Sequence, residues 1–245
     1  MLRYQSYLED ITVAGLRMNH QPMPGLALVF ICPFIVCTGE SGRMYQLMRG
    51  VNGRQKGVAI NFGIYEVTDE LDAQGPFYFK ADKAPVLEPL IVRDDGETVA
   101  YEGAHFSLQF SPRGHKWIDA SGDVELAIEH VGKVSTFWIP KQKLSSHPQM
   151  LRSHMGRVTG AIGGDRVTGL FMVDFIYSQP ELLWNEMGMM TELHNVWLNW
   201  MVEYEDGGYE RGLAWRGRPG TNFAAAHHIV DGVSAARCDA KIELE

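Results

Sequence analysis

The segment RVTGAIGGDRVTGLFMVDFIY, residues 157–177, contains a short repeat and an apolar run. The tetrapeptide Arg-Val-Thr-Gly stands at 157–160 and returns at 166–169, a spacing too short for a repeated domain. The two copies fit the arms of a hairpin that turns at Gly163-Gly164, because glycine tolerates the positive φ of tight turns. The sequence therefore predicts two antiparallel strands joined at this point.

Asp174 is the one charged residue in the apolar run 170–177. In a strand, Asp174 shares a face with Leu170, Met172 and Ile176, and the opposite face is also apolar. We expect the carboxyl to be at least partly buried, and therefore either paired or protonated. Its partner would be a backbone N–H or an arginine such as Arg152, Arg157 or Arg216. A protonated carboxyl in an apolar setting is a natural general acid.

Period-two alternation also marks the ranges 98–110, 123–130 and 194–205. Such alternation predicts half-buried strands, and Gly- and Asp-rich turns separate them. The range 178–187, with Pro180 in its first turn, is the one convincing candidate for a short helix. We expect an all-β, antiparallel fold with few short helices. A polar stretch at 141–148 divides it into halves, 1–145 and 146–245, packed as one unit.

Composition limits the functional classes. The chain has 245 residues and a formal net charge of −8, with no basic cluster, which argues against a nucleic-acid partner. The apolar run 26–37 contains Pro33 and is far shorter than the roughly 20 residues of a membrane helix. Three cysteines without metal-type spacing indicate free thiols and a cytoplasmic protein, although a bridge from Cys238 to Cys32 or Cys37 stays open. A homo-oligomer also stays open.

No nucleotide fingerprint, H-E-x-x-H, C-x-x-C or G-x-S-x-G motif is present, so no cofactor is expected. His194 begins an alternating strand, and His227 is adjacent to His228, so these two point to opposite faces. Asp174, Glu192, His194 and either His227 or His228 could form a metal site. A hydrogen-bonded Asp–His or Asp–Arg pair is the stronger interpretation, and no metal is predicted. The candidate catalytic residues are Asp174, His194 and His227.

Aromatic and sulfur side chains are plentiful in the second half of the chain. Each one alone is more simply explained as core, but together they can line an apolar cavity. The candidate substrate-binding residues are Tyr177, Trp184, Met187, Trp197 and Trp200.

The order of these features resembles a known family. A short-turned hairpin at 160–169 leads to an Asp at Met172-Val173-Asp174, followed by the Trp-rich segment 196–200 and an Asp206-Gly207-Gly208 turn. This layout is similar to the lipocalin-like family that includes carotenoid 1,2-hydratase (hydroxyneurosporene synthase) and related cyclases. The resemblance covers roughly the last third of the chain. It implies one lipocalin-like barrel or two packed barrel halves, an apolar cavity, and the family's acid at Asp174.

The residues are compatible with three functional hypotheses. The first is a cofactor-independent hydratase, lyase, isomerase or cyclase that acts on a hydrophobic, isoprenoid- or polyketide-like molecule. In it Asp174 donates a proton, and His194 or His227 takes the matching one or holds Asp174 in position. The second is a carrier that binds an apolar metabolite without chemistry. The third is a metal-dependent hydrolase that uses Glu192, His194 and His227.

Overall fold

The computed structural model of the protein describes residues 4–20, 24–52, 58–67, 90–120, 123–142, 145–182, 186, 196–217 and 224–237. Strands dominate these residues, so the all-β prediction is confirmed. In chain order the elements are β1 Gln5–Glu9, α1 Val13–Arg17, β2 Ala27–Gly39, β3 Met44–Asn52, β4 Val58–Val67, β5 Ile91–Asp94, β6 Val99–Glu102, β7 Phe106–Ser111, β8 Gly114–Asp119, β9 Val124–His130, β10 Val134–Ile139, β11 Gln149–Ile162, β12 Asp165–Ser178, β13 Val196–Glu203, β14 Tyr209–Arg216, β15 Ala224–Val230 and β16 Val233–Arg237.

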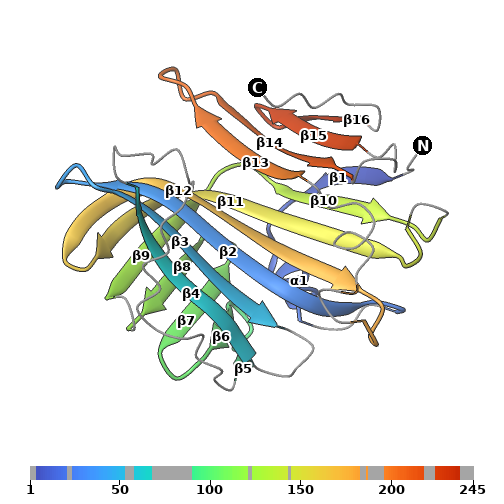
Figure 1. The fold of residues 1–245 in the computed structure, drawn as a ribbon, viewed down its shortest axis with the longest axis horizontal. Helices are drawn as coiled ribbons and strands as arrows, with labels where there is room; N and C mark the ends of the chain where they lie inside the picture. The colour runs from blue at the N-terminus through green and yellow to red at the C-terminus, as the bar shows by residue number, and fades with distance from the viewer. Residues whose placement is uncertain are drawn as a thin grey trace.

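The main sheet is antiparallel and has the order β4-β3-β2-β12-β11-β9-β8-β7-β6-β5. It curls into a half-barrel, with β2, β3 and β4 in front of β5 to β8 in Figure 1. The other half of β11 pairs with β10, and β10 pairs with β1. β11 therefore lies at a fork, with β9 beside its second half and β10 beside its first.

The predicted hairpin is the centre of this sheet. β11 and β12 pair over their full length, from Ile162 opposite Asp165 to Met150 opposite Tyr177. Gly163 and Gly164 form the turn with φ values of 57° and 81°, which glycine adopts readily. Since β11 and β12 pair with β2, β9 and β10, the sheet runs across the expected boundary between residues 145 and 146.

The hydrophobic core fills the concave, inner face of the curl. Odd-numbered residues of β12, such as Phe171 and Phe175, point inward and meet side chains of β6, β7 and β8. The Phe175 ring lies 5.3 Å from that of Phe110 and 6.1 Å from that of Tyr101, between ring centroids. Even-numbered residues of β12, Asp174 among them, therefore point to the convex, outer face.

A second sheet, with the order β13-β14-β15-β16, packs on that outer face. Trp215 of β14 meets Phe137 of β10 edge to face, with 4.6 Å between ring centroids. At the other end of the contact, Arg157 of β11 forms a bidentate ion pair with Glu203 of β13. The two sheets lie beside each other at the top of Figure 1.

Helical structure differs from the prediction. The helix α1 was not predicted; Thr12 caps it by accepting a hydrogen bond from the Gly15 N–H at 3.0 Å. Ser178, the first residue of the expected helix 178–187, is the last residue of β12, and residues 179–182 form a turn. Of the rest of that expected helix, only Glu186 is among the described residues.

Cys32 and Cys37 are free thiols, and Cys238, the other half of the two bridges that the sequence left open, lies outside the described residues. Within the described ranges no helix is long and apolar enough to cross a membrane.

Candidate active site between the two sheets

Asp174 lies in the middle of β12 with its side chain on the outer face of the main sheet. Its position was expected to be buried, and only 2% of its surface is exposed. Ser153 of β11 stands directly opposite and donates its hydroxyl to the Asp174 Oδ1. Cys32 of β2 stands opposite on the other side. Asp174 is therefore a buried carboxyl whose hydrogen-bond donor is a neutral hydroxyl.

Burial controls the charge of this carboxyl. Removal from water raises the pKa of Asp174 from 3.8 to about 7, and the hydrogen bond from Ser153 lowers that pKa only in part. Burial, with the Asp174 carboxyl beside it, also raises the pKa of the Cys32 thiol to about 12. At neutral pH, Asp174 is therefore about half protonated, while Cys32 keeps its proton and is a poor nucleophile.

A row of polar side chains extends from Asp174 toward the small sheet. Ser153 is paired with Asp174 on one side and with Ser135 of β10 on the other, and neighbours in one register share a face. The Ser135 hydroxyl lies 2.7 Å from Nδ1 of His227 on β15. Both hydroxyls are buried. The row Asp174-Ser153-Ser135-His227 thus links two of the predicted catalytic residues across two sheets.

The imidazole of His227 is neutral at pH 7 and can therefore accept a proton. Burial lowers its pKa to about 4, and the nearby Arg211 guanidinium and His228 add to that effect. The histidine contacts a serine through Nδ1, and Asp174 contacts a different serine. This arrangement is not the Ser-His-Asp triad of acyl transfer, in which one histidine bridges the serine and the acid.

Arg211 of β14 is a cation on the same face of the small sheet as His227. It alternates with Leu213 and Trp215 on the face that covers the main sheet, and none of its surface is exposed. Its Nη2 donates to the Lys133 carbonyl, but Nε and Nη1 have no acceptor among the described residues. Burial lowers the pKa of Arg211 to about 10, so it stays charged at neutral pH.

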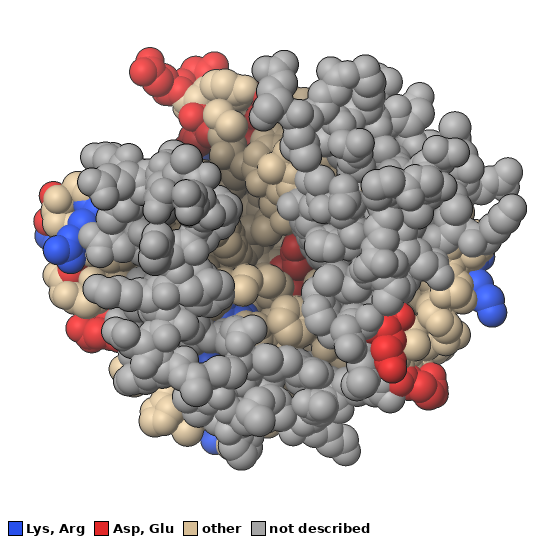
Figure 2. Space-filling model, in the orientation of Figure 1, with Lys and Arg blue, Asp and Glu red and all other residues tan. Residues whose placement is uncertain are grey.

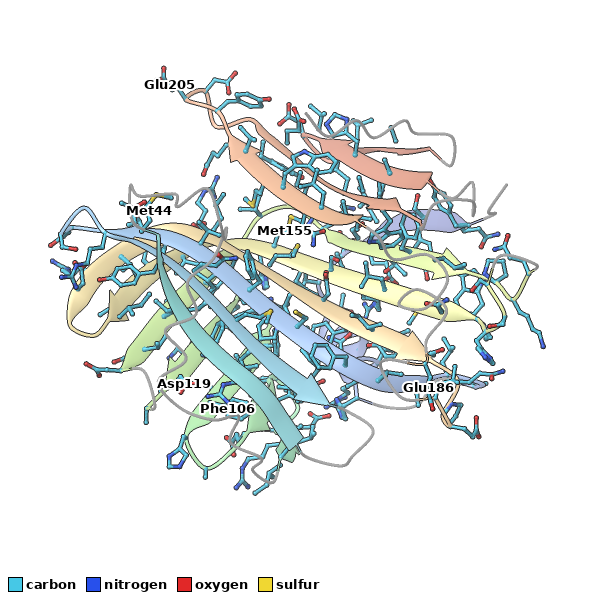
Figure 3. The ribbon with its side chains drawn as sticks, viewed as in Figure 1. Met44, Phe106, Asp119, Met155, Glu186 and Glu205 are labelled. Carbon is cyan, nitrogen blue, oxygen red and sulfur yellow. The ribbon has the colours of Figure 1, made fainter. Side chains whose placement is uncertain are left out.

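A partly exposed apolar strip lies on one side of the buried acid, toward the start of β12. Phe34 is opposite Met172, and Val36 is opposite Leu170, on the outer face of β2 and β12. These four side chains are half-buried or exposed, in contrast to Asp174. Figure 2 shows that this face of the molecule is hollowed near its middle, with acidic side chains (red) visible in the hollow. Figure 3 labels Met155 of β11 in the same region, close to the small sheet.

Comparisons with known proteins do not identify a family. No known protein family, curated protein or solved structure matches the chain. The resemblance to lipocalin-like hydratases therefore stays a prediction, and the function must be inferred from the geometry of the inter-sheet site.

The remaining predicted residues lie apart from the row. Tyr177 points to the inner face, where its hydroxyl donates to Asn19 Oδ1 at 3.1 Å. Trp200 lies on the face of the small sheet opposite to His227, and its Nε1 donates to Glu210 at 3.4 Å. Four other side chains fall outside the described part of the structure: His194, Trp184, Met187 and Trp197.

Two of the three arginines proposed as partners of Asp174 have other partners. Arg152 points inward, where its Nη1 donates to the Gly15 carbonyl at 2.6 Å and to Asn19. Arg157 pairs with Glu203, and the side chain of Arg216 is outside the described set.

Within the described residues, no three His, Cys, Asp or Glu side chains are arranged to hold a metal ion. Glu192 and His194, expected for the hydrolase hypothesis, lie outside that set.

The inner face holds a histidine cluster that no sequence motif predicted. His115 lies 4.2 Å from His130 and 5.4 Å from His154, between ring centroids. Burial lowers the pKa of His115 and His154 well below 6.5, so both are neutral at pH 7. Their ring nitrogens have no partner among the described residues. Because the sheet separates this cluster from Asp174, it belongs to the core.

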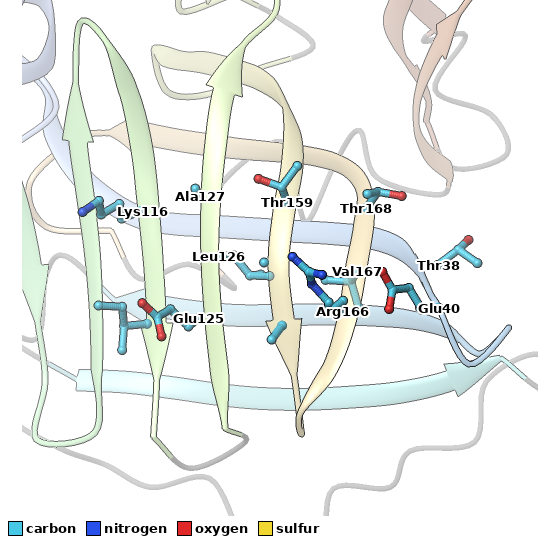
Figure 4. A pocket seen from close by; sticks show the side chains of 14 residues that line it. Thr38, Glu40, Lys116, Glu125, Leu126, Ala127, Thr159, Arg166, Val167 and Thr168 are labelled. Carbon is cyan, nitrogen blue, oxygen red and sulfur yellow. The ribbon is translucent and has the colours of Figure 1, made fainter.

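A second hollow is an open groove of about 940 Å³ at the far end of β12. Figure 4 shows its polar lining, which includes Lys116, Glu125 and Arg166 beside threonines. Six residues of strand, on the order of 20 Å, separate Thr168 in this groove from Asp174. The charged groups there are solvent-exposed, so the groove lacks the buried acid that marks the inter-sheet site.

Proposed function

We propose that the protein is a cofactor-independent hydratase or lyase, isomerase or cyclase that acts on a hydrophobic small molecule. The observation that supports this proposal is the Asp174 carboxyl, which is buried at an apolar face with a pKa raised to about 7. A general acid works best when its pKa is near the working pH, because it can then both hold and release its proton. Burial achieves this here without a second charge.

In the hydratase form of the reaction, the Asp174 carboxyl gives its proton to one carbon of an alkene. The other carbon becomes electron-poor and forms a bond to a water oxygen. A proton from that water goes to the Asp174 carboxylate, or to the neutral His227, which releases it to solvent while Asp174 takes a proton from solvent. The net change is addition of one water, and no redox partner is needed. The reverse order is the lyase reaction.

The hydrophobic substrate class is inferred from the surroundings of the acid. Phe34, Met172 and Leu170 border Asp174 and retain some exposure, so an apolar molecule can cover them. Partly exposed apolar strips of this kind mark binding surfaces. The proposed substrate therefore lies on the outer face of β2 and β12, outside the aromatic core of the half-barrel.

Proton transfer to carbon can be tested without knowledge of the natural substrate. A panel of isoprenoid- and polyketide-like alkenes is incubated with the protein in D₂O, and deuterium in the products is measured by mass spectrometry. We expect at least one compound to gain carbon-bound deuterium, and Asp174→Asn to slow this roughly 10²- to 10⁴-fold, the usual contribution of general acid catalysis. Cys32→Ser, a change beside Asp174 that spares the acid, is the control.

A panel without deuterium gain, or an equally fast Asp174→Asn protein with native circular dichroism, would contradict the proposal. The first result, combined with tight binding of apolar compounds, would favour the alternative of a carrier. The exposed apolar strip is the observation that favours the carrier, because binding of an apolar molecule without a reaction needs no acid.

A further inference from the structure

Arg211 indicates what kind of molecule the inter-sheet site accepts. A guanidinium has five N–H donors, and this one has a single acceptor, the Lys133 carbonyl, among the described residues. No described carboxylate forms an ion pair with it, although none of its surface is exposed. Buried charges in proteins are nearly always paired, because an unpaired one is costly.

The surroundings of Arg211 supply the other requirements of an anion site. Arg211 is diagonal to His227 on one face of the small sheet, since Leu213 pairs with His227. His227 in turn contacts the Ser135 hydroxyl. Leu213 and Ile229 beside them are buried and apolar. The region therefore combines a cation, a hydroxyl and a neutral imidazole with apolar walls, and no acid occupies it among the described side chains.

We infer that Arg211 binds the anionic end of an amphiphilic molecule, a carboxylate on an apolar chain, whose other end reaches Asp174. The role of Asp174 in this inference rests on the proposed function. Binding of the anionic end at Arg211 does not depend on the proposed function. The strand that carries Ser135 lies two strand spacings from the one that carries Asp174, on the order of 10 Å. A chain of about ten carbons spans such a distance.

The test compares decanoate with decanol, which have the same chain length and differ in charge. Isothermal titration calorimetry at pH 8 should show that the wild-type protein binds decanoate at least about tenfold more tightly, the usual effect of a charge-assisted hydrogen bond in a buried site. Arg211→Met should remove the preference, and Arg211→Lys should keep part of it. The control Arg113→Met, at an exposed arginine, should leave it unchanged.

Equal affinity for the two compounds, no decanoate binding by the wild-type protein, or a retained preference in Arg211→Met would overturn the inference. Without ligand, Arg211→Met should melt at the wild-type temperature or above, because it removes a buried unpaired charge. If that variant does not fold, the wild-type and Arg211→Lys comparisons decide the question. Asp174→Asn should keep the decanoate preference, so failure of catalysis and failure of anion binding are separate results.

Discussion

The raised pKa of Asp174 makes the stability of the protein depend on pH. The folded state keeps the Asp174 proton up to about pH 7, whereas an unfolded chain loses it near pH 3.8. The folded state therefore binds more protons between these values, and stability falls as the pH rises through this window. The full penalty, at most about 4 kcal/mol, applies above pH 7. A purely structural residue at this position would be better apolar, so the penalty itself favours a functional role.

Ser153 sets how far the pKa of Asp174 rises. Its hydroxyl donates to the carboxylate and stabilises the charged form. Ser153→Ala should therefore raise the pKa of Asp174 above that of the wild type. The check is a pH titration of the side-chain carboxyl by ¹³C NMR, with Ser178→Ala on the same hairpin as control. An unchanged or lower midpoint would show that the hydrogen bond does not act on Asp174.

Among the secondary-structure elements, the hairpin of β11 and β12 could be predicted from the sequence. Its strand register could have been predicted as well. The Gly163-Gly164 turn places Ile162 opposite Asp165, and counting outward places Ser153 opposite Asp174. Ser153 could therefore have been predicted from the sequence as the partner of Asp174. The sequence does not show which face of β12 is concave, because both faces of the run 170–177 are apolar and the curvature arises from the pairing of β12 with β2 and of β11 with β9.

Gly160 lies in the part of β11 that pairs with β9, opposite Leu126. Its φ of 150° is outside the range that other residues favour, and a Cβ there would collide with the Glu125 carbonyl. Gly160→Ala should lower the free energy of unfolding by roughly 1–3 kcal/mol. Urea denaturation measures this, with the exposed Thr159→Ala as a neighbouring control. Equal stability of the two variants would mean that the strand can absorb the side chain.

At the scale of the whole molecule, the functional hypothesis depends on the contact between the two sheets. The sequence identified His227 and Asp174 separately, but their place at the two ends of one row with Ser135 and Ser153 depends on β15 lying over β10. No local pattern predicts such packing, because Ser135 and His227 are far apart in the chain. Arg211 was missed for the same reason: in the sequence it is one arginine in an alternating strand.

Phe137 should account for most of this contact. It is buried against Trp215 and stacks on Tyr4 at 4.3 Å between ring centroids. Phe137→Ala should cost about 3–5 kcal/mol of stability, the range for a buried aromatic. Arg157→Gln, which breaks a partly exposed ion pair, should cost less than about 1 kcal/mol. Guanidinium unfolding followed by tryptophan fluorescence compares them, and a larger loss for Arg157→Gln would refute this ranking.

The pH titration of Asp174 shows whether this carboxyl can act as an acid at neutral pH. ¹³C NMR of the aspartate carboxyls between pH 3 and pH 9 should show one resonance with a midpoint near 7, and Asp174→Asn should remove that resonance alone. If every aspartate in the wild-type protein titrates near the ordinary value of about 4, Asp174 is charged at neutral pH. It could not then serve as the acid, and the proposed chemistry would be wrong.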